Sequence, residues 1–293
     1  MNIKFLFFSI SITLCGCSQK VVIDQIFLEQ DSPIGYTAIT CNLKPKGDML
    51  LFPGFGETST DVLNATKLPE MMAKSGVAVF IPSLQNGADT YGFSNESQSC
   101  LTDVVDDIQK RYNLADIPYC VGGFSMGGAT AIRYAELVEN KPFALFAIDS
   151  PLDYKRFLLA TKRDIELYHK DTEDGIYAKL YRDIEGIKDC SPYEIADTTH
   201  SAIMTLREVP VRYYIEPAED WWLNNRRTDA LGLNIIDGTC FINDLRLNGN
   251  DKADLILTRD RGYRKSTGQK HPHSWTIVDN KNLLNWINSL LMR

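Results

Sequence analysis

Lysine and arginine are too few and too scattered in this sequence to form a basic surface. The 293 residues contain 31 Lys and Arg against 38 Asp and Glu, which gives a net charge of −7. A protein that neutralises the phosphates of nucleic acid carries the opposite balance, concentrated on one face. Nucleic acid is therefore not an expected partner.

The sequence also lacks an apolar run long enough to span a membrane. In the first twenty residues, MNIKFLFFSISITLCGCSQK, an apolar and hydroxylic run follows Lys4 and ends at Cys15. A transmembrane helix needs roughly 20 apolar residues, so this segment is interpreted as a secretory signal.

The end of this signal, Leu14-Cys15-Gly16-Cys17, resembles the lipobox of bacterial lipoproteins. The resemblance implies that Cys17 is lipidated and that residues 1–17 are a leader outside the fold. A plain secretory signal is the alternative. In both cases the mature protein is expected outside the cytoplasm, and the lipid would anchor it to a membrane of the cell envelope.

Cysteines are few, and no pair has the spacing of a zinc site. An odd number of cysteines follows the leader, in a compartment expected to be oxidising. They allow one or two disulfides, which the sequence does not pair, and Cys120 is expected to be a buried reduced thiol. These cysteines are Cys41, Cys100, Cys120, Cys190 and Cys240.

Short apolar segments alternate with segments of helical periodicity along most of the chain. Such alternation predicts βαβ units and a mostly parallel sheet covered on both faces by helices. The expected fold class is α/β, with a core formed by residues 18–150 and 210–293. The expected strands are 21–28, 36–40, 49–52, 76–82, 118–122, 143–148, 211–215 and 253–258. Helical spacing occurs at 61–74, 101–112, 126–139 and 283–291.

The alternation stops between residues 151 and 209, where no convincing strand occurs. Apolar residues follow a helical rhythm around 157–168 and again at 176–187, with a charged segment between them. Residues 151–209 are therefore expected to form a helical insertion on the sheet.

Residues 122–129 read GGFSMGGA and place Ser125 where an expected strand turns into an expected helix. A serine at so sharp a turn takes a strained backbone conformation that projects its hydroxyl above the sheet edge. The helix can pack this close to the strand only where side chains are absent, as at Gly123, Gly127 and Gly128. A glycine-rich turn with an incidental serine is the alternative.

The segment Gly123-Phe124-Ser125-Met126-Gly127 resembles the nucleophile elbow of the α/β-hydrolase superfamily. The resemblance extends to the order of elements over nearly the whole mature chain. It implies a serine hydrolase whose nucleophile, acid and histidine follow one another in that order along the chain.

The resemblance also implies an oxyanion hole made of two main-chain N–H groups. One follows the nucleophile, at Met126. The other is expected from the loop PGFG at residues 53–56, where Phe55 is the preferred donor and Gly56 the alternative. Pro53 stands where the superfamily loop has histidine.

Four histidines are available as the base: His169, His200, His271 and His273. The first two lie in the insertion, where a structural or surface role is expected. The resemblance places the catalytic histidine between the last strand and the last helix, in the segment HPHSW. His273 is the preferred base because Pro272 stiffens the approach to it, and His271 is the alternative.

An acid must orient this imidazole and stabilise it once it is protonated. The resemblance places the acid about five residues past the strand 211–215, which favours Asp220, with the adjacent Glu219 as an alternative. Glu216, next to the strand, is expected to be structural. Asp149, at the end of an earlier strand, is a second location because some relatives carry their acid there.

These features predict a serine hydrolase that cleaves an ester through an acyl-enzyme, without a metal or organic cofactor. The insertion lacks the long apolar surface of an interfacial lipase, which favours a small or moderately sized ester. Trp221 and Tyr91 are the expected substrate-binding residues. A peptidase or thioesterase of the same fold and a non-catalytic cell-surface binding lipoprotein are the alternatives. A phosphate-binding turn is disfavoured, since residues 122–128 lack the lysine of a P-loop.

Overall fold

A computed structural model describes residues 20–29, 33–84, 95–168, 176–197, 199 and 201–292. They include an 8-stranded sheet with the strand order β1-β2-β4-β3-β5-β6-β7-β8. β1 pairs with β2 and β2 with β4 in antiparallel fashion, and every other pair is parallel. The predicted α/β class with a mostly parallel sheet is confirmed. The strands are β1 (Val21–Phe27), β2 (Gly35–Cys41), β3 (Gly47–Phe52), β4 (Val77–Ser83), β5 (Tyr119–Phe124), β6 (Ala144–Ile148), β7 (Val211–Ile215) and β8 (Ala253–Leu257).

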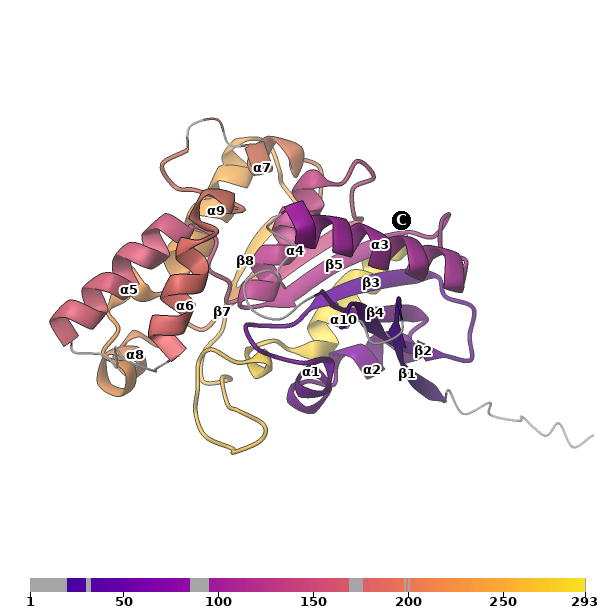
Figure 1. Ribbon diagram of the computed structural model, residues 1–293, viewed down its shortest axis with the longest axis horizontal. Helices are drawn as coiled ribbons and strands as arrows, with labels where there is room; N and C mark the ends of the chain where they lie inside the picture. The colour runs from indigo at the N-terminus through magenta and orange to yellow at the C-terminus, as the bar shows by residue number, and fades with distance from the viewer. Residues whose placement is uncertain are drawn as a thin grey trace, which may run out of the picture.

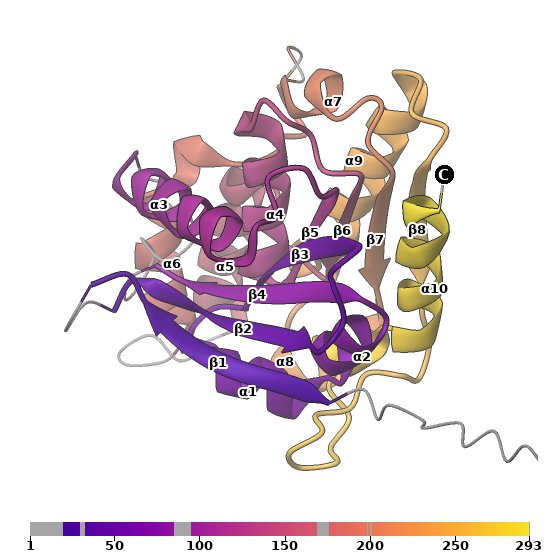
Figure 2. The same cartoon turned by 90° about the vertical axis from the view of Figure 1, so that its right-hand side faces the viewer.

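Helices pack on both faces of this sheet (Figures 1 and 2). One face is covered by α3 (Asn95–Tyr112), α4 (Met126–Leu137) and α9 (Ile235–Leu247), and the other by α1 (Ser59–Ala65), α2 (Leu68–Lys74) and α10 (Asn280–Leu291).

The strand residues alternate between these two cores because successive side chains of a strand point to opposite faces. In β3, Leu50 and Phe52 join the core beneath α3 and α4, whereas Met49 and Leu51 join the core beneath α2 and α10. This double burial explains why the central strands read as continuous apolar runs.

Between β6 and β7 the described residues form helices and no strand. These helices are α5 (Tyr154–Tyr168), α6 (Ile176–Glu185), the short 3₁₀ helix η2 (Lys188–Cys190) and α7 (Ser201–Thr205). A second group follows β7, namely α8 (Glu219–Arg226) and the 3₁₀ helix η3 (Ala230–Gly232), which leads into α9. Figure 1 shows α5, α6 and α8 together at one end of the molecule.

A buried ion pair fastens α5 to α9. Arg156 donates to both carboxylate oxygens of Asp237 and, through Nη1, to the Leu231 carbonyl oxygen. The main-chain N–H groups of Leu152 and Asp153 donate to Asp237 as well. Because neither charge is left without partners, the pair tolerates its burial and fixes α5 above the sheet edge.

Several sequence predictions lie outside the described residues. The leader with Cys17, the proposed substrate-binding residue Tyr91, and His169 and His200 belong to this group.

No helix of the described segments is long and apolar enough to cross a membrane. Among the described residues, the thiols of Cys41, Cys120, Cys190 and Cys240 are free.

Candidate active site

Ser125 occupies the tight turn between β5 and α4. Its backbone angles are φ 54° and ψ −126°, a strained conformation for a residue with a side chain. Its N–H donates to the Ile148 carbonyl oxygen at 2.8 Å, which fastens the turn to β6. A Cβ atom added to Gly127 would lie 2.2 Å from the Phe52 carbonyl oxygen, so a glycine is needed where α4 begins.

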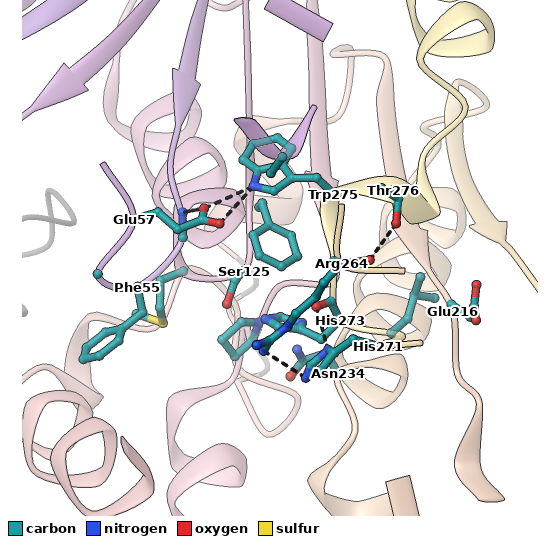
Figure 3. A pocket seen from close by; sticks show the side chains of 18 of the residues that line it. Phe55, Glu57, Ser125, Glu216, Asn234, Arg264, His271, His273, Trp275 and Thr276 are labelled. Atoms are coloured by element: carbon teal, nitrogen blue, oxygen red, sulfur yellow. Dashed lines mark hydrogen bonds between the residues drawn. The ribbon is translucent and has the colours of Figure 1, made fainter. Parts of the chain in front are cut away.

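A cavity of about 1200 Å³ opens at this turn. It lies between the carboxyl edge of the sheet, α5, α8 and the segment 263–266. Ser125, Met126 and His273 line it together with Phe55. Figure 3 shows Ser125 between Phe55 on one side and His273 on the other. Three of the residues predicted to act together therefore share one cavity with the serine.

His273 is hydrogen-bonded to Asp149. Its Nδ1 lies 2.8 Å from Oδ2 of this carboxylate, which is only 3% exposed. A carboxylate accepts, so Nδ1 carries the proton and Nε2 is the nitrogen left to act as a base. The Phe124 ring lies against the imidazole, with 4.5 Å between ring centroids.

Asp149 is held rigidly at the end of β6. Its backbone bends to φ 46°, and its N–H donates to the Tyr214 carbonyl oxygen at 2.8 Å. The Asn234 amide donates to both Oδ1 and the main-chain oxygen of Asp149, each at 3.0 Å. The buried Tyr213 hydroxyl fixes the next residue, since it accepts from the Ser150 N–H and donates to the Ser150 carbonyl oxygen.

The structure thus gives His273 a different carboxylate from Asp220, the acid predicted here. Asp220 and Glu219 are exposed in the first turn of α8, and neither is hydrogen-bonded to a histidine within the described segments. The physical reason is that α8 begins directly after the loop and carries both side chains away from the cavity. Glu216 accepts from the N–H groups of Arg261 and Gly262, which agrees with a structural role.

His271, the alternative base, has both ring nitrogens engaged. Nδ1 lies 2.9 Å from the His273 carbonyl oxygen, and Nε2 lies 3.1 Å from Nη2 of Arg264. A carbonyl can only accept and a guanidinium can only donate, so His271 is the neutral tautomer protonated at Nδ1. Burial, together with the nearby charge of Arg264, lowers the pKa of His271 to about 4.

Glu57 holds the loop after β3 beside Ser125. This carboxylate accepts from the Gly54 N–H at 2.8 Å and from Trp275 Nε1 at 3.1 and 3.2 Å (Figure 3). The Glu57 N–H donates back to the Gly54 carbonyl oxygen, which closes a turn with Phe55 and Gly56 at its centre. Burial raises the pKa of Glu57 above its ordinary value.

Trp222, rather than the predicted Trp221, lines the cavity. Trp221 packs behind it, with its ring 5.3 Å from that of Trp222 and 5.0 Å from that of His271. The side chain of Trp221 therefore supports the histidine segment from outside the cavity wall.

Two features of the site had no signal in the sequence. Glu57 and Asn234 contact groups that are distant along the chain, and neither stands in a recognisable motif.

No cluster of three or more His, Cys, Asp or Glu side chains in the described segments has the arrangement of a metal site.

Comparisons with known proteins find similarity in structure alone. No protein-family model matches the chain, and no curated protein is similar to it in sequence. An esterase of Pyrococcus furiosus superimposes with a TM-score of 0.59 at 13% identity, over 94% of this chain and 91% of that one. The chain has the α/β-hydrolase fold.

Other solved structures agree with this fold. A ferulic acid esterase covers 94% of this chain and 97% of its own, with a TM-score of 0.58 and 14% identity. Carboxyl esterase 2 of Tuber melanosporum covers 96% and 88%, with a TM-score of 0.56 and 12% identity. In this structure, Ser125 follows β5 and Asp149 follows β6 at the carboxyl edge of the sheet, and His273 is hydrogen-bonded to Asp149 there. Ligands bind at this edge in open α/β sheets.

Proposed function

We propose that this protein is a serine hydrolase that cleaves a carboxylic ester, with Ser125 as nucleophile, His273 as base and Asp149 as acid. The observation that carries the proposal is the hydrogen bond of His273 Nδ1 to the buried Asp149, at the cavity into which the strained turn presents Ser125. An ester is favoured over a peptide or thioester because the structural relatives named above are esterases.

The reaction follows from the tautomer of His273. Asp149 keeps the proton on Nδ1, so Nε2 takes the proton of the Ser125 hydroxyl as its oxygen attacks the ester carbonyl. The N–H groups of Met126 and Phe55 are the proposed donors to the resulting oxyanion. Protonated His273 then gives its proton to the leaving alcohol, and a water molecule hydrolyses the acyl-enzyme by the same route.

The hydroxyl of Ser125 is not hydrogen-bonded to His273 in the described part of the chain. Such bonds are often long in enzymes without substrate and tighten only in the complex. Both side chains line the same cavity, which supports the proposed proton transfer.

Export and lipid attachment at Cys17 are part of the proposal. They are supported by the leader-like composition of residues 1–17 and the Leu14–Cys17 pattern. Mass spectrometry of the N-terminal peptide from the native host tests them, since a diacylglycerol-modified Cys17 is expected. An unmodified N-terminus after another cleavage site would contradict lipid attachment, and a chain that still begins at Met1 would contradict both.

The hydrolase proposal is tested with 4-nitrophenyl acetate, butyrate and octanoate. The purified protein is expected to release nitrophenol, and Ser125→Ala and His273→Ala are each expected to lower kcat at least about a thousandfold. A folded wild type that hydrolyses none of these esters and does not react with a fluorophosphonate probe would instead support the non-catalytic binding protein.

A further inference from the structure

Three carboxylates that line the cavity, Glu57, Glu216 and Asp61, are hydrogen-bonded to neutral groups of the protein. Glu57 accepts from Gly54 and Trp275, and Glu216 accepts from two main-chain N–H groups. Asp61 caps α1 by accepting from Thr58. These three carboxylates therefore take their hydrogen bonds from neutral groups of the protein and not from the cations of the cavity wall, and a fourth, Asp164, lines the cavity at α5.

Three cationic side chains of the cavity wall have no such partner. Arg226, Arg264 and Lys265 line the cavity, and none of them pairs with a carboxylate among the described residues. The fourth cation of the wall, Lys67, is paired with Glu70. An unpaired cationic group is unexpected beside the active site of a chain with a net charge of −7.

Arg264 is positioned by its own hairpin. Its N–H donates to the Gln269 carbonyl oxygen at 2.9 Å, and its carbonyl oxygen accepts from the N–H groups of Thr267 and Gly268. Gly268 takes φ 67°, which closes this turn. The backbone of Arg264 is therefore held at the cavity mouth even though its side chain is exposed.

The guanidinium of Arg264 is held by a neutral group. It donates through Nη2 to Nε2 of His271, whose proton lies on Nδ1 and is committed to the His273 carbonyl oxygen. A carboxylate in this place would cancel the charge of Arg264, whereas the imidazole only orients it and leaves the other N–H groups for a ligand. His271 in turn is adjacent to the proposed base, so the oriented charge lies close to the reacting centre.

Arg226 approaches the same place from α8. Its guanidinium lies 5.7 Å from the Trp221 ring, which packs on His271. Two guanidinium groups from separate elements therefore converge around one buried histidine (Figure 3 shows Arg264, His271 and His273 in this region).

We infer that Arg264, assisted by Arg226 and Lys265, binds an anionic group carried by the ester substrate, a carboxylate or a phosphate. A guanidinium matches the paired oxygens of either group. The inference rests on the proposed function and adds the substrate class to it. The substrate would be an ester that carries a negative charge on its acyl or its alcohol part.

The test compares neutral and charged esters of matched size. On the acyl side, 4-nitrophenyl hexanoate is compared with 4-nitrophenyl hydrogen adipate. On the alcohol side, phenyl acetate is compared with 4-acetoxybenzoate and with 4-acetoxyphenyl phosphate, which separates a carboxylate from a phosphate. Each pair is measured with the wild type, with Arg264→Gln and with Arg259→Gln. Arg259 serves as the matched control because its side chain is 95% exposed and does not line the cavity.

In Arg264→Gln, the ratio of kcat/KM for charged over neutral ester is expected to fall about five- to tenfold for at least one pair, mainly through KM. The loss is modest because an exposed charge is screened, and it should shrink in 0.5 M salt. Arg259→Gln should keep the wild-type ratio. An unchanged ratio in Arg264→Gln for all pairs would overturn the inference.

A failure of the proposed function gives a different result. If the wild type hydrolyses no ester and does not react with a fluorophosphonate, benzoate and phenyl phosphate are tested as ligands by saturation-transfer NMR. Binding that is lost in Arg264→Gln but kept in Arg259→Gln would support the anionic subsite without hydrolysis. Absence of binding to the wild type would overturn the subsite as well.

Discussion

Gly127 permits the sharp turn at Ser125. A Cβ atom at this position would lie 2.2 Å from the Phe52 carbonyl oxygen and 2.3 Å from that of Pro53. Both oxygens belong to backbone that leads into the proposed oxyanion loop, so they cannot move without displacing Phe55. Gly127 therefore determines the position of both Ser125 and this loop.

Gly127→Ala is expected to lower the free energy of unfolding by at least about 2 kcal/mol and to reduce kcat, because α4 must shift away from the loop. Chemical denaturation and ester hydrolysis measure the two effects. Gly186→Ala is the matched control, since the nearest atom to an added Cβ there is 3.5 Å away. Equal stability and activity of the two variants would show that the turn has more room than the structure indicates.

His271 makes stability depend on pH. Its pKa is about 4 in the folded protein and about 6.5 in the unfolded chain, so the unfolded chain binds more protons between these values. The free energy of unfolding attributable to His271 is therefore highest above pH 6.5 and falls as the pH decreases toward 4, by about 2 kcal/mol at pH 5.

Other buried groups act in the opposite direction, so the test is a difference between two proteins. Burial raises the pKa of Asp48 to about 7 and also raises that of Glu57, and both effects favour the folded state at lower pH. Urea denaturation of wild type and His271→Gln at pH 7.5 and pH 5 cancels these contributions. The difference in free energy of unfolding between wild type and His271→Gln should be about 2 kcal/mol smaller at pH 5 than at pH 7.5. A difference that does not depend on pH would contradict the lowered pKa of His271.

Glu57 joins two loops that come from opposite ends of the sequence. One loop follows β3 and carries Phe55. The other carries His273 and continues into Trp275, at the start of the 3₁₀ helix η4 (Trp275–Ile277). A side chain that bonds both loops sets the distance between the proposed oxyanion donor and the proposed base.

Glu57→Ala is expected to lower kcat about 10- to 100-fold with a smaller change in KM, because the Phe55 N–H is no longer held in place. Glu57→Gln keeps one acceptor oxygen and should recover part of the loss. Glu70→Ala, which removes an acid from the surface of α2, is the control. If Glu57→Ala lowers stability but leaves kcat unchanged, the residue is structural and does not position the loop.

The sequence predicts strands better than it predicts helices. The strand β7 has the predicted bounds, and β3 to β6 agree within two residues at each end, because buried strands must be continuously apolar. One helical segment was expected at 61–74, but the chain forms α1 and α2, separated at Thr66 and Lys67 with Pro69 in the first turn of α2. α8 and α9 were not predicted, since their apolar residues do not repeat on one clear face.

The order of the strands in the sheet brings the candidate site together. β5 lies between β3 and β6, so the loop after β3, the turn after β5 and the end of β6 are neighbours at one edge of the sheet. Local pattern and chain order predict Ser125 and His273 as site residues, and both line the same cavity. The carboxylate that contacts His273 could not be predicted, because the strands before Asp149 and Asp220 both end at this edge and only the path of α8 decides between them.

Kinetics of Asp149→Asn and Asp220→Asn test whether Asp149 is the acid that acts with His273. An amide at residue 149 no longer stabilises the imidazolium, so Asp149→Asn should lower kcat for 4-nitrophenyl butyrate about a thousandfold or more, whereas Asp220→Asn should stay within about twofold of wild type. The reverse result, a large loss in Asp220→Asn with Asp149→Asn nearly fully active, would show that Asp220, and not Asp149, acts with His273.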